Sequence, residues 1–231
     1  MIFDLNYILM VMLPGLVLAG VASWYTKSTF NKYSKVGVKT GTTGAQAAAQ
    51  LLRNAGIHDV GIEPVQGFLS DHYDPRAKML RLSPAVYGGR SLSAIGVACH
   101  EAGHALQHAK GYAPLKMRST LVPAASVTSN LAMPLLMIGL FMNAQPLLLL
   151  GAGLFSVAVL FAIVTLPVEW DASARAKKLM VSTGIVDQQE AQHAGSVLNA
   201  AFLTYLASAL TAILTLLYYL MRAGVLGGSR D

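Results

Sequence analysis

The stretch Ser91-Leu-Ser-Ala-Ile-Gly-Val-Ala-Cys-His-Glu-Ala-Gly-His-Ala-Leu-Gln-His108 contains an H-E-x-x-H pattern, His100-Glu101-Ala102-Gly103-His104. Residues four apart in a helix lie one turn apart on the same face, so His100 and His104 can direct imidazole nitrogens at one point, which suits a zinc ion. Glu101 lies beside them without being needed as a ligand. We therefore predict that it accepts a proton from a zinc-bound water and passes it to a leaving amine.

The residues around this pattern predict a buried helix, because small and apolar side chains dominate it; these include Ala94, Ile95, Val97, Ala98, Ala102, Ala105 and Leu106. Buried helices do not usually carry His, Glu and His on one stripe unless these are paired or bind a metal. The alternative is a helix with two hydrogen-bonded core histidines and a solvated Glu101. Cys99 is the only cysteine, which excludes an internal disulfide and a cysteine-rich zinc site.

The composition predicts an integral membrane protein. The 231 residues are 54% hydrophobic and only 12% charged, whereas soluble domains carry about 25% charged residues. Apolar runs long enough to cross a bilayer, with no Asp, Glu, Lys, Arg or His in their interiors, cover residues 7–25, 121–142, 147–167 and 198–221. The first run follows the acidic Asp4 and no basic residue, and it is long for a signal peptide, so a retained anchor is the better interpretation. The short gap after residue 142 makes the second and third runs a hairpin.

The distribution of Lys and Arg predicts the orientation. Most of them lie in residues 26–120 and 168–197, which four spans place on one side, and the basic side should be cytoplasmic. The net charge of +6 is then explained by topology and attraction to the lipid bilayer rather than by nucleic-acid binding. The expected segments are an anchor (1–26), a cytoplasmic catalytic domain (27–120), a transmembrane hairpin (121–167), a cytoplasmic helical segment (168–197) and a last span with its tail (198–231).

The catalytic domain should also contain a helix and short strands. The residues from Thr42 to about Ala55 show helical spacing, with Gly56 as its C-terminal cap. Residues 58–83 predict two or three strands: one around residues 60–65, a resumption at residues 68–69, a turn over residues 71–75, and an extended segment at residues 78–82. That last segment could be an edge strand that holds a substrate backbone, or only part of a structural hairpin. His72 falls in the turn and is expected to be exposed, with a substrate-side or supporting role as the alternative.

A catalytic zinc needs a third protein ligand in addition to His100 and His104. Three histidines on successive turns rarely converge on one ion, so His108 more plausibly supports the site or faces the substrate. The metzincin pattern is excluded, because Gln107 and Lys110 stand where that pattern has Gly and His. Glu169 is the favoured ligand, at the mouth of the third span and in a second helix that starts near Pro167. A carboxylate that only complements the helix dipole is the alternative.

Three other polar residues are candidates for secondary roles. Asp171 is offset from Glu169 and could pair with Arg175 or orient a ligating histidine. His193 could assist an oxyanion, although a solvated loop histidine is favoured. Tyr205 lies inside the last span and could reach the site only from its cytoplasmic end.

Several dispersed motifs together resemble the YugP-type family of bacterial membrane zinc metallopeptidases. They are Leu69-Ser-Asp-His-Tyr-Asp-Pro75, Leu82-Ser83, Ala98-Cys-His-Glu-Ala-Gly-His-Ala-Leu-Gln-His108, Leu166-Pro-Val-Glu-Trp-Asp-Ala-Ser173 and Leu198-Asn-Ala-Ala-Phe-Leu-Thr-Tyr205. The resemblance implies zinc held by His100, His104 and Glu169. The chain is more distantly similar to the HtpX-type quality-control proteases, in which an Asp commonly follows the ligand Glu by four residues. Ser173 takes that position here, so Asp171 or Ser173 would support the ligands.

These observations predict a mainly α-helical integral membrane protein with four transmembrane helices and a small α+β, zincin-like cytoplasmic catalytic element. The expected function is a zinc-dependent, gluzincin-like endopeptidase of the bacterial cytoplasmic membrane. Its substrates would be peptides or membrane proteins, which includes membrane-protein quality control. Two alternatives are a zinc-stabilised membrane scaffold or adaptor without turnover, which the retained Glu101 argues against, and a metal transporter, which the absence of ionisable residues within the spans argues against.

Overall fold

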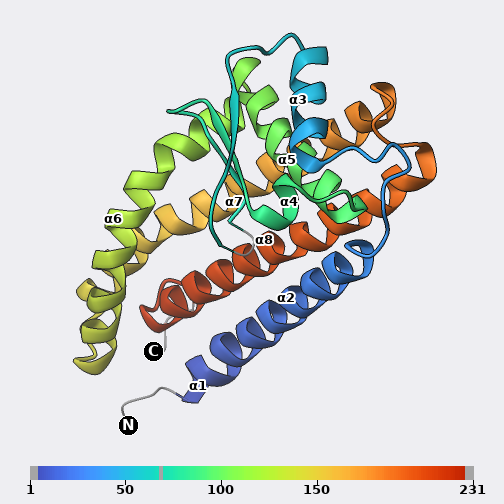
Figure 1. Ribbon diagram of the computed structural model, residues 1–231. Coiled ribbons are helices and arrows are strands. Elements are labelled where there is room, and N and C mark those ends of the chain that lie inside the picture. Colours follow the sequence, from blue (N-terminus) through green and yellow to red (C-terminus); the bar gives the residue numbers. More distant parts are fainter. Residues whose placement is uncertain (1–4, 68–69, 227–231) are drawn as a thin grey trace. The chain divides into compact units, whose positions relative to one another are not determined.

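The computed structural model describes residues 5–67 and 70–226, and the predicted strand segment at residues 68–69 lies outside them. The chain divides into two compact units. One comprises the described residues up to Ala22, then Lys116–Leu166 and the residues from Thr204 onward, and the other comprises Ser23–Leu115 and Pro167–Leu203. We call the first the apolar helical unit and the second the motif unit, because it contains the H-E-x-x-H residues (Figure 1).

Four helices in the described part of the chain are long and apolar enough to cross a membrane: Leu5–Tyr33, Ala113–Phe141, Gln145–Ser182 and Gln188–Arg222. Each of them overlaps one of the four apolar runs seen in the sequence, and only the run at 121–142 extends past its helix, by one residue. The first comprises α1 (Leu5–Tyr7), a π-helical turn (Ile8–Met12) and α2 (Leu13–Tyr33), and the others are α6, α7 and α8 in that order. Four candidate spans in a mainly helical chain are thus confirmed by length and composition.

The apolar helical unit has a small core of its own. Its buried residues include Val11, Leu136, Leu148 and Tyr219. The turn between α6 and α7 is as tight as expected, since α6 ends at Phe141 and α7 begins at Gln145. Asn143 in this turn has a positive φ of 50°, a conformation in which Asn is favoured over most residues.

Helix α7 (Gln145–Ser182) runs without interruption through Pro167, so the expected second helix beginning near that proline is wrong. A proline inside a helix removes one backbone hydrogen bond. Apolar helices tolerate this loss when neighbouring groups satisfy the freed carbonyl. Helix α8 (Gln188–Arg222) likewise starts well before the last apolar run. His193 is therefore helical and stacks on Tyr33 with ring centroids 5.1 Å apart, and its prediction as a solvated loop residue is wrong.

The motif unit contains a three-stranded sheet within the described residues, in the order β1-β3-β2. β1 (Gly61–Pro64) pairs parallel with β3 (Met79–Leu82), and β2 (His72–Asp74) pairs antiparallel with β3. The residues predicted as a turn around His72 therefore form a strand instead. β3 is the central strand with partners on both sides, so the prediction that residues 78–82 form a substrate-binding edge is also wrong.

Arg81 on the central strand β3 forms ion pairs with both neighbouring strands. Its Nε donates to Glu63 Oε1 on β1 at 2.7 Å, and its Nη1 donates to Asp74 Oδ2 on β2 at 2.7 Å. The hydrogen bond from Arg81, with backbone hydrogen bonds from Ala77 and Arg76, holds the pKa of Asp74 at about 2. One guanidinium thus connects both edge strands to the centre. The pattern of residues along the chain does not predict which strands such an arginine will connect.

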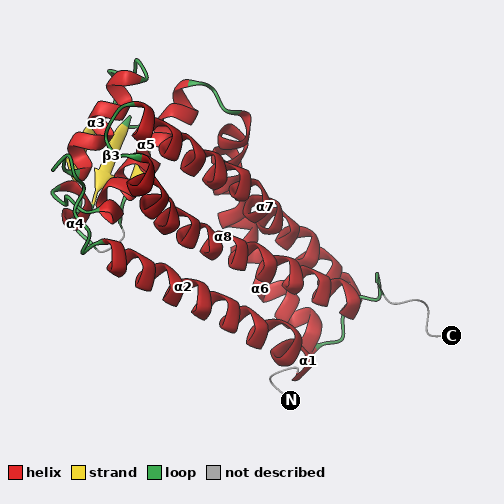
Figure 2. Ribbon diagram, turned by 90° about the vertical axis from the view of Figure 1, so that its right-hand side faces the viewer, coloured by secondary structure: helices red, strands yellow, loops and turns green. Residues whose placement is uncertain are grey.

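Helix α5 (Leu92–Ala109) carries the H-E-x-x-H residues and forms the centre of the motif unit. Ser91 caps its N-terminus by accepting a hydrogen bond from the amide of Ala94 at 3.2 Å. α3 (Gly44–Asn54) packs along α5 (Figure 1), and its own capping box at Thr43 and a Gly56 with φ of 74° match the helix predicted over this stretch. The core between them includes Leu51, Ile95 and Ala98, and β3 covers it from another side (Figure 2).

Candidate metal centre

His100 and His104 lie one turn apart on α5, and α7 brings Glu169 against both of them. Glu169 Oε2 is 3.1 Å from His100 Nε2 and 3.6 Å from His104 Nε2. One potential ligand atom from each of the three residues lies within 4.8 Å of the others, and the Glu169 side chain is only 2% exposed. The structure thus gathers the three residues that the sequence suggested as ligands, from parts of the chain 65 or more residues apart.

The Nδ1 atoms of both histidines are already occupied by other partners. His100 Nδ1 lies 3.1 Å from Ser173 Oγ, and His104 Nδ1 lies 3.0 Å from Gln107 Oε1. An amide oxygen only accepts, so His104 Nδ1 carries the proton in this hydrogen bond, and in the neutral ring Nε2 is the unprotonated nitrogen. Partners of this kind fix the ring orientation and tautomer of metal-binding histidines.

Gln107 holds the two helices of the centre together. It is fully buried, and its Nε2 donates to Val168 O and to Asp171 Oδ2, both at 2.8 Å. Asp171 also accepts a hydrogen bond from Arg175 Nε at 2.5 Å. Of the two roles considered for Asp171, the structure therefore shows the pairing with Arg175, and it connects the same carboxylate to His104 only through Gln107.

A close approach of α5 to α7 determines where Glu169 lies. A Cβ on Gly103 would lie 2.6 Å from the backbone oxygen of Ala172, which is far inside any normal contact. Gly103 is adjacent to His104 in sequence, and Ala172 follows Glu169 by about one turn. The missing side chain of Gly103 thus lets the two backbones approach closely enough for Glu169 to reach both imidazoles.

Glu101 is the acidic residue next to this group. Its side chain belongs to a residue that is 8% exposed, and within the described part of the chain it forms no hydrogen bond or ion pair. Burial lowers the pKa of His104, but the hydrogen bond to Glu169 and the negative charges of Glu101 and Glu169 outweigh it, so the pKa of His104 is raised. Two carboxylates close to one imidazole give the site a negative electrostatic potential, which favours binding of a cation.

The remaining candidate histidines lie outside this group of three. His108 Nδ1 is 2.8 Å from Tyr73 Oη on β2, and burial, with the charges of Asp59 and Asp74, raises the pKa of Tyr73 to about 12. His72 is exposed, as expected, with its Nδ1 2.8 Å from Ser70 O. Tyr205 belongs to the apolar helical unit.

The side chains present fit a zinc ion. Two imidazole Nε2 atoms and one carboxylate oxygen converge, which is the ligand number and chemistry of a catalytic zinc site with a position left for water. The Glu101 carboxylate adds negative charge beside His104, and this charge also favours a bound cation.

Comparison with known proteins identifies the family. The chain belongs to the zinc metallopeptidase family described as "Putative neutral zinc metallopeptidase", whose model matches residues 8–224. It is similar to the "Putative membrane protease YugP" of Bacillus subtilis (strain 168), with 46% identity over 200 residues that cover 87% of this chain and 89% of that protein. No solved structure matches the chain. The resemblance to the YugP-type family seen in the motifs is thereby confirmed.

Sequence reasoning missed Gln107 and Gly103 as contributors to the centre. Gln107 lies three residues after His104, a spacing at which side chains on a helix are neighbours, so the pattern could have indicated this contact. Gly103 occupies one of the variable positions of H-E-x-x-H. Its importance follows only from the backbone of α7, which no local pattern in α5 contains.

Proposed function

We propose that this protein is a membrane-embedded, zinc-dependent endopeptidase of the gluzincin type, with His100, His104 and Glu169 as ligands and Glu101 as general base. The observation that carries the proposal is the convergence of the three ligand atoms within 4.8 Å. The family and the membrane protease relative support the same class of reaction. A glutamate on a separate helix as third ligand is what supports the gluzincin type.

A zinc ion held by the three ligands would polarise the carbonyl of the scissile peptide bond and lower the pKa of the attacking water. Glu101 accepts the proton of the attacking water and then donates it to the leaving amine, so that the peptide bond breaks without release of a free amide anion. Ser173 and Gln107 hold the two imidazoles through their Nδ1 atoms. Asp171 acts one step further out, by accepting from Gln107.

We also propose that the centre faces the cytoplasm and that its substrates are peptide segments of membrane or membrane-associated proteins. The excess of Lys and Arg in residues 26–120 and 168–197 supports the orientation. The apolar helices that continue directly into the motif unit support substrates close to the bilayer. A role in the quality control of membrane proteins is consistent with that substrate class.

The test is Glu101→Gln in the purified full chain. We expect the variant to bind zinc in the same stoichiometry as the wild type, because Glu101 is not a ligand, and to lose peptide cleavage by about a hundred-fold or more. Zinc is measured by elemental analysis and cleavage with an unstructured protein such as casein. His104→Ala serves as the matched control that should lose both zinc and cleavage. An unchanged cleavage rate in Glu101→Gln would remove Glu101 from the mechanism, and zinc without any wild-type turnover would favour the scaffold.

A further inference from the structure

Both tryptophans of the chain lie at one level of the motif unit and are exposed. Trp24 on α2 is 69% exposed and Trp170 on α7 is 59% exposed. Thr26 Oγ1 donates to Ala200 O on α8 at 2.9 Å, and the Trp170 ring is 5.4 Å from that of Phe202, two residues further along α8. Two residues of a helix correspond to about 3 Å. Exposed tryptophans at one level of helices that continue into apolar spans are typical of the boundary between bilayer and water.

Lys177 places a cation at this boundary. Its backbone lies seven residues, or about 10 Å, beyond Trp170 on α7, yet its Nζ is only 5.7 Å from the centroid of the Trp170 ring. The side chain therefore runs back toward the apolar spans, and Nζ lies 3.4 Å from Asn199 Oδ1 on α8. Within the described residues Lys177 forms no ion pair. The Lys177 ammonium therefore has no carboxylate as a counter-charge in the described structure.

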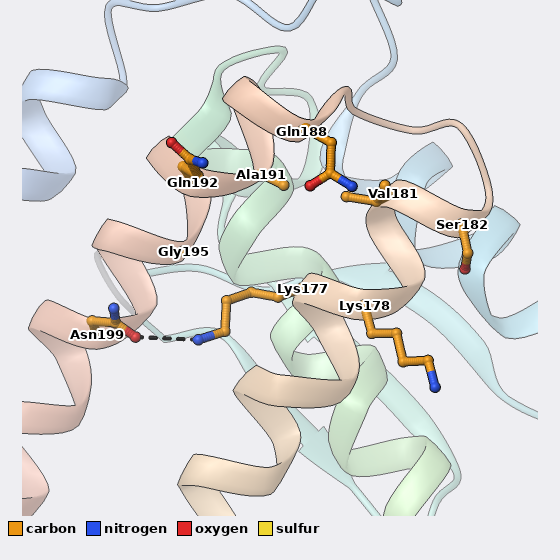
Figure 3. A pocket seen from close by; sticks show the side chains of 9 residues that line it. All are labelled: Lys177, Lys178, Val181, Ser182, Gln188, Ala191, Gln192, Gly195 and Asn199. Atoms are coloured by element: carbon orange, nitrogen blue, oxygen red, sulfur yellow. Dashed lines mark hydrogen bonds between the residues drawn. The ribbon is translucent and has the colours of Figure 1, made fainter.

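Lys177 lines a pocket of about 560 Å³ between the end of α7 and the start of α8 (Figure 3). Gln192, Gly195 and Asn199 of α8 line one side of the pocket. A Cβ on Gly195 would lie 2.9 Å from Lys177 Cδ, so the glycine makes room for the lysine stem. Figure 3 shows Lys177 extending toward Asn199, whereas Lys178 points away from it.

We propose that this pocket binds the phosphate group of an anionic phospholipid. Lys177 supplies the charge, the side-chain amides of Asn199 and Gln192 supply neutral donors, and the exposed ring of Trp170 contacts the lipid below the phosphate. Free phosphate offers the same anion chemistry. The position of the ammonium over an exposed tryptophan, beside the start of an apolar span, favours a phosphate that is attached to a lipid. The site is independent of peptide hydrolysis.

Quenching of tryptophan fluorescence by brominated lipids tests the proposal. In the full chain carrying Trp24→Phe, Trp170 is the only tryptophan. After reconstitution at fixed ionic strength, we expect brominated phosphatidylglycerol to quench Trp170 more than brominated phosphatidylcholine at the same mole fraction. The expected preference is about five-fold in relative association, the value for one cation at an anionic surface. It should disappear in Lys177→Gln, persist in Lys177→Arg and persist in the matched control Lys178→Gln.

Three results would overturn the lipid site. Equal quenching by both lipids would show that no anionic headgroup is preferred. A preference that survives Lys177→Gln would assign it to other residues. A preference that excess inorganic phosphate abolishes at constant ionic strength would identify a site for free anions instead. Circular dichroism spectra that match the parent protein show that each variant is folded, and none of these readouts requires zinc or turnover.

Discussion

At the scale of single residues, Gln107 contributes most to the centre among the residues that are not proposed ligands. Its oxygen accepts from His104 Nδ1, and its nitrogen donates to Val168 O and Asp171 Oδ2. One amide thus determines the tautomer of a proposed ligand and joins α5 to the part of α7 that carries Glu169. A carboxylate could accept from His104 but could not donate to both oxygens, so the amide is suited to this position.

We therefore expect Gln107→Met, which keeps the volume but removes the hydrogen bonds, to weaken zinc binding by about 10- to 100-fold. Competition with a chromophoric chelator measures the affinity. Gln50→Met is the matched control, because among the described residues the Gln50 side chain donates one hydrogen bond, to Thr183 O, away from the centre. Equal affinities for the Gln107→Met variant and the wild type would show that His104 is oriented by other contacts.

At the scale of secondary-structure elements, the crossing of α5 and α7 decides whether the centre can form. Gly103 permits the approach, and the buried core formed by α3, α5 and the end of α7 holds α5 in place. The sheet is joined across its strands by Arg81. Residues 78–82 belong to the structural hairpin that was the other interpretation from sequence, because β3 pairs with a strand on each side and offers no free edge to a substrate.

We expect Gly103→Ala to push α7 away from α5 and to destabilise the protein by about 1–3 kcal/mol. When less than one zinc ion per protein chain is supplied, the variant should bind none of it. The physical reason is the 2.6 Å approach of the added Cβ to the backbone oxygen of Ala172. Thermal unfolding and elemental analysis measure the two effects. Gly153→Ala on α7 is the control, since nothing lies within 4 Å of the added Cβ there. Full zinc occupancy in Gly103→Ala would show that α5 and α7 can move apart without separating the proposed ligands.

At the scale of the whole molecule, the four apolar helices and the distribution of basic residues predict one orientation in the membrane. Lys110, at the end of α5, should face the cytoplasm, and Asn143, in the turn between α6 and α7, should face the other side. Cys99 is fully buried, and burial raises the pKa of its thiol, so the native chain offers an unreactive background for cysteine labelling.

In sealed spheroplasts an impermeant maleimide should therefore label Asn143→Cys, and it should label Lys110→Cys only after the membrane is opened. Both positions are exposed, so a difference between them reports the side of the membrane rather than burial. The unsubstituted chain is the control and should remain unlabelled in both conditions. The reverse labelling pattern would place the motif unit outside the cytoplasm and would contradict the proposed orientation.

The sequence by itself determined the features that depend on local periodicity and composition. Helical spacing aligned His100 with His104, and apolar runs of sufficient length predicted the four candidate spans. The tertiary structure decided the features that depend on contacts between distant segments. These are the approach of Glu169 through Gly103, the hydrogen bonds of Gln107, the central position of β3 and the continuity of α7 through Pro167. The physical reason is that a pattern along the chain describes which face of an element is apolar, whereas the partner that packs on that face is chosen by atoms elsewhere in the chain.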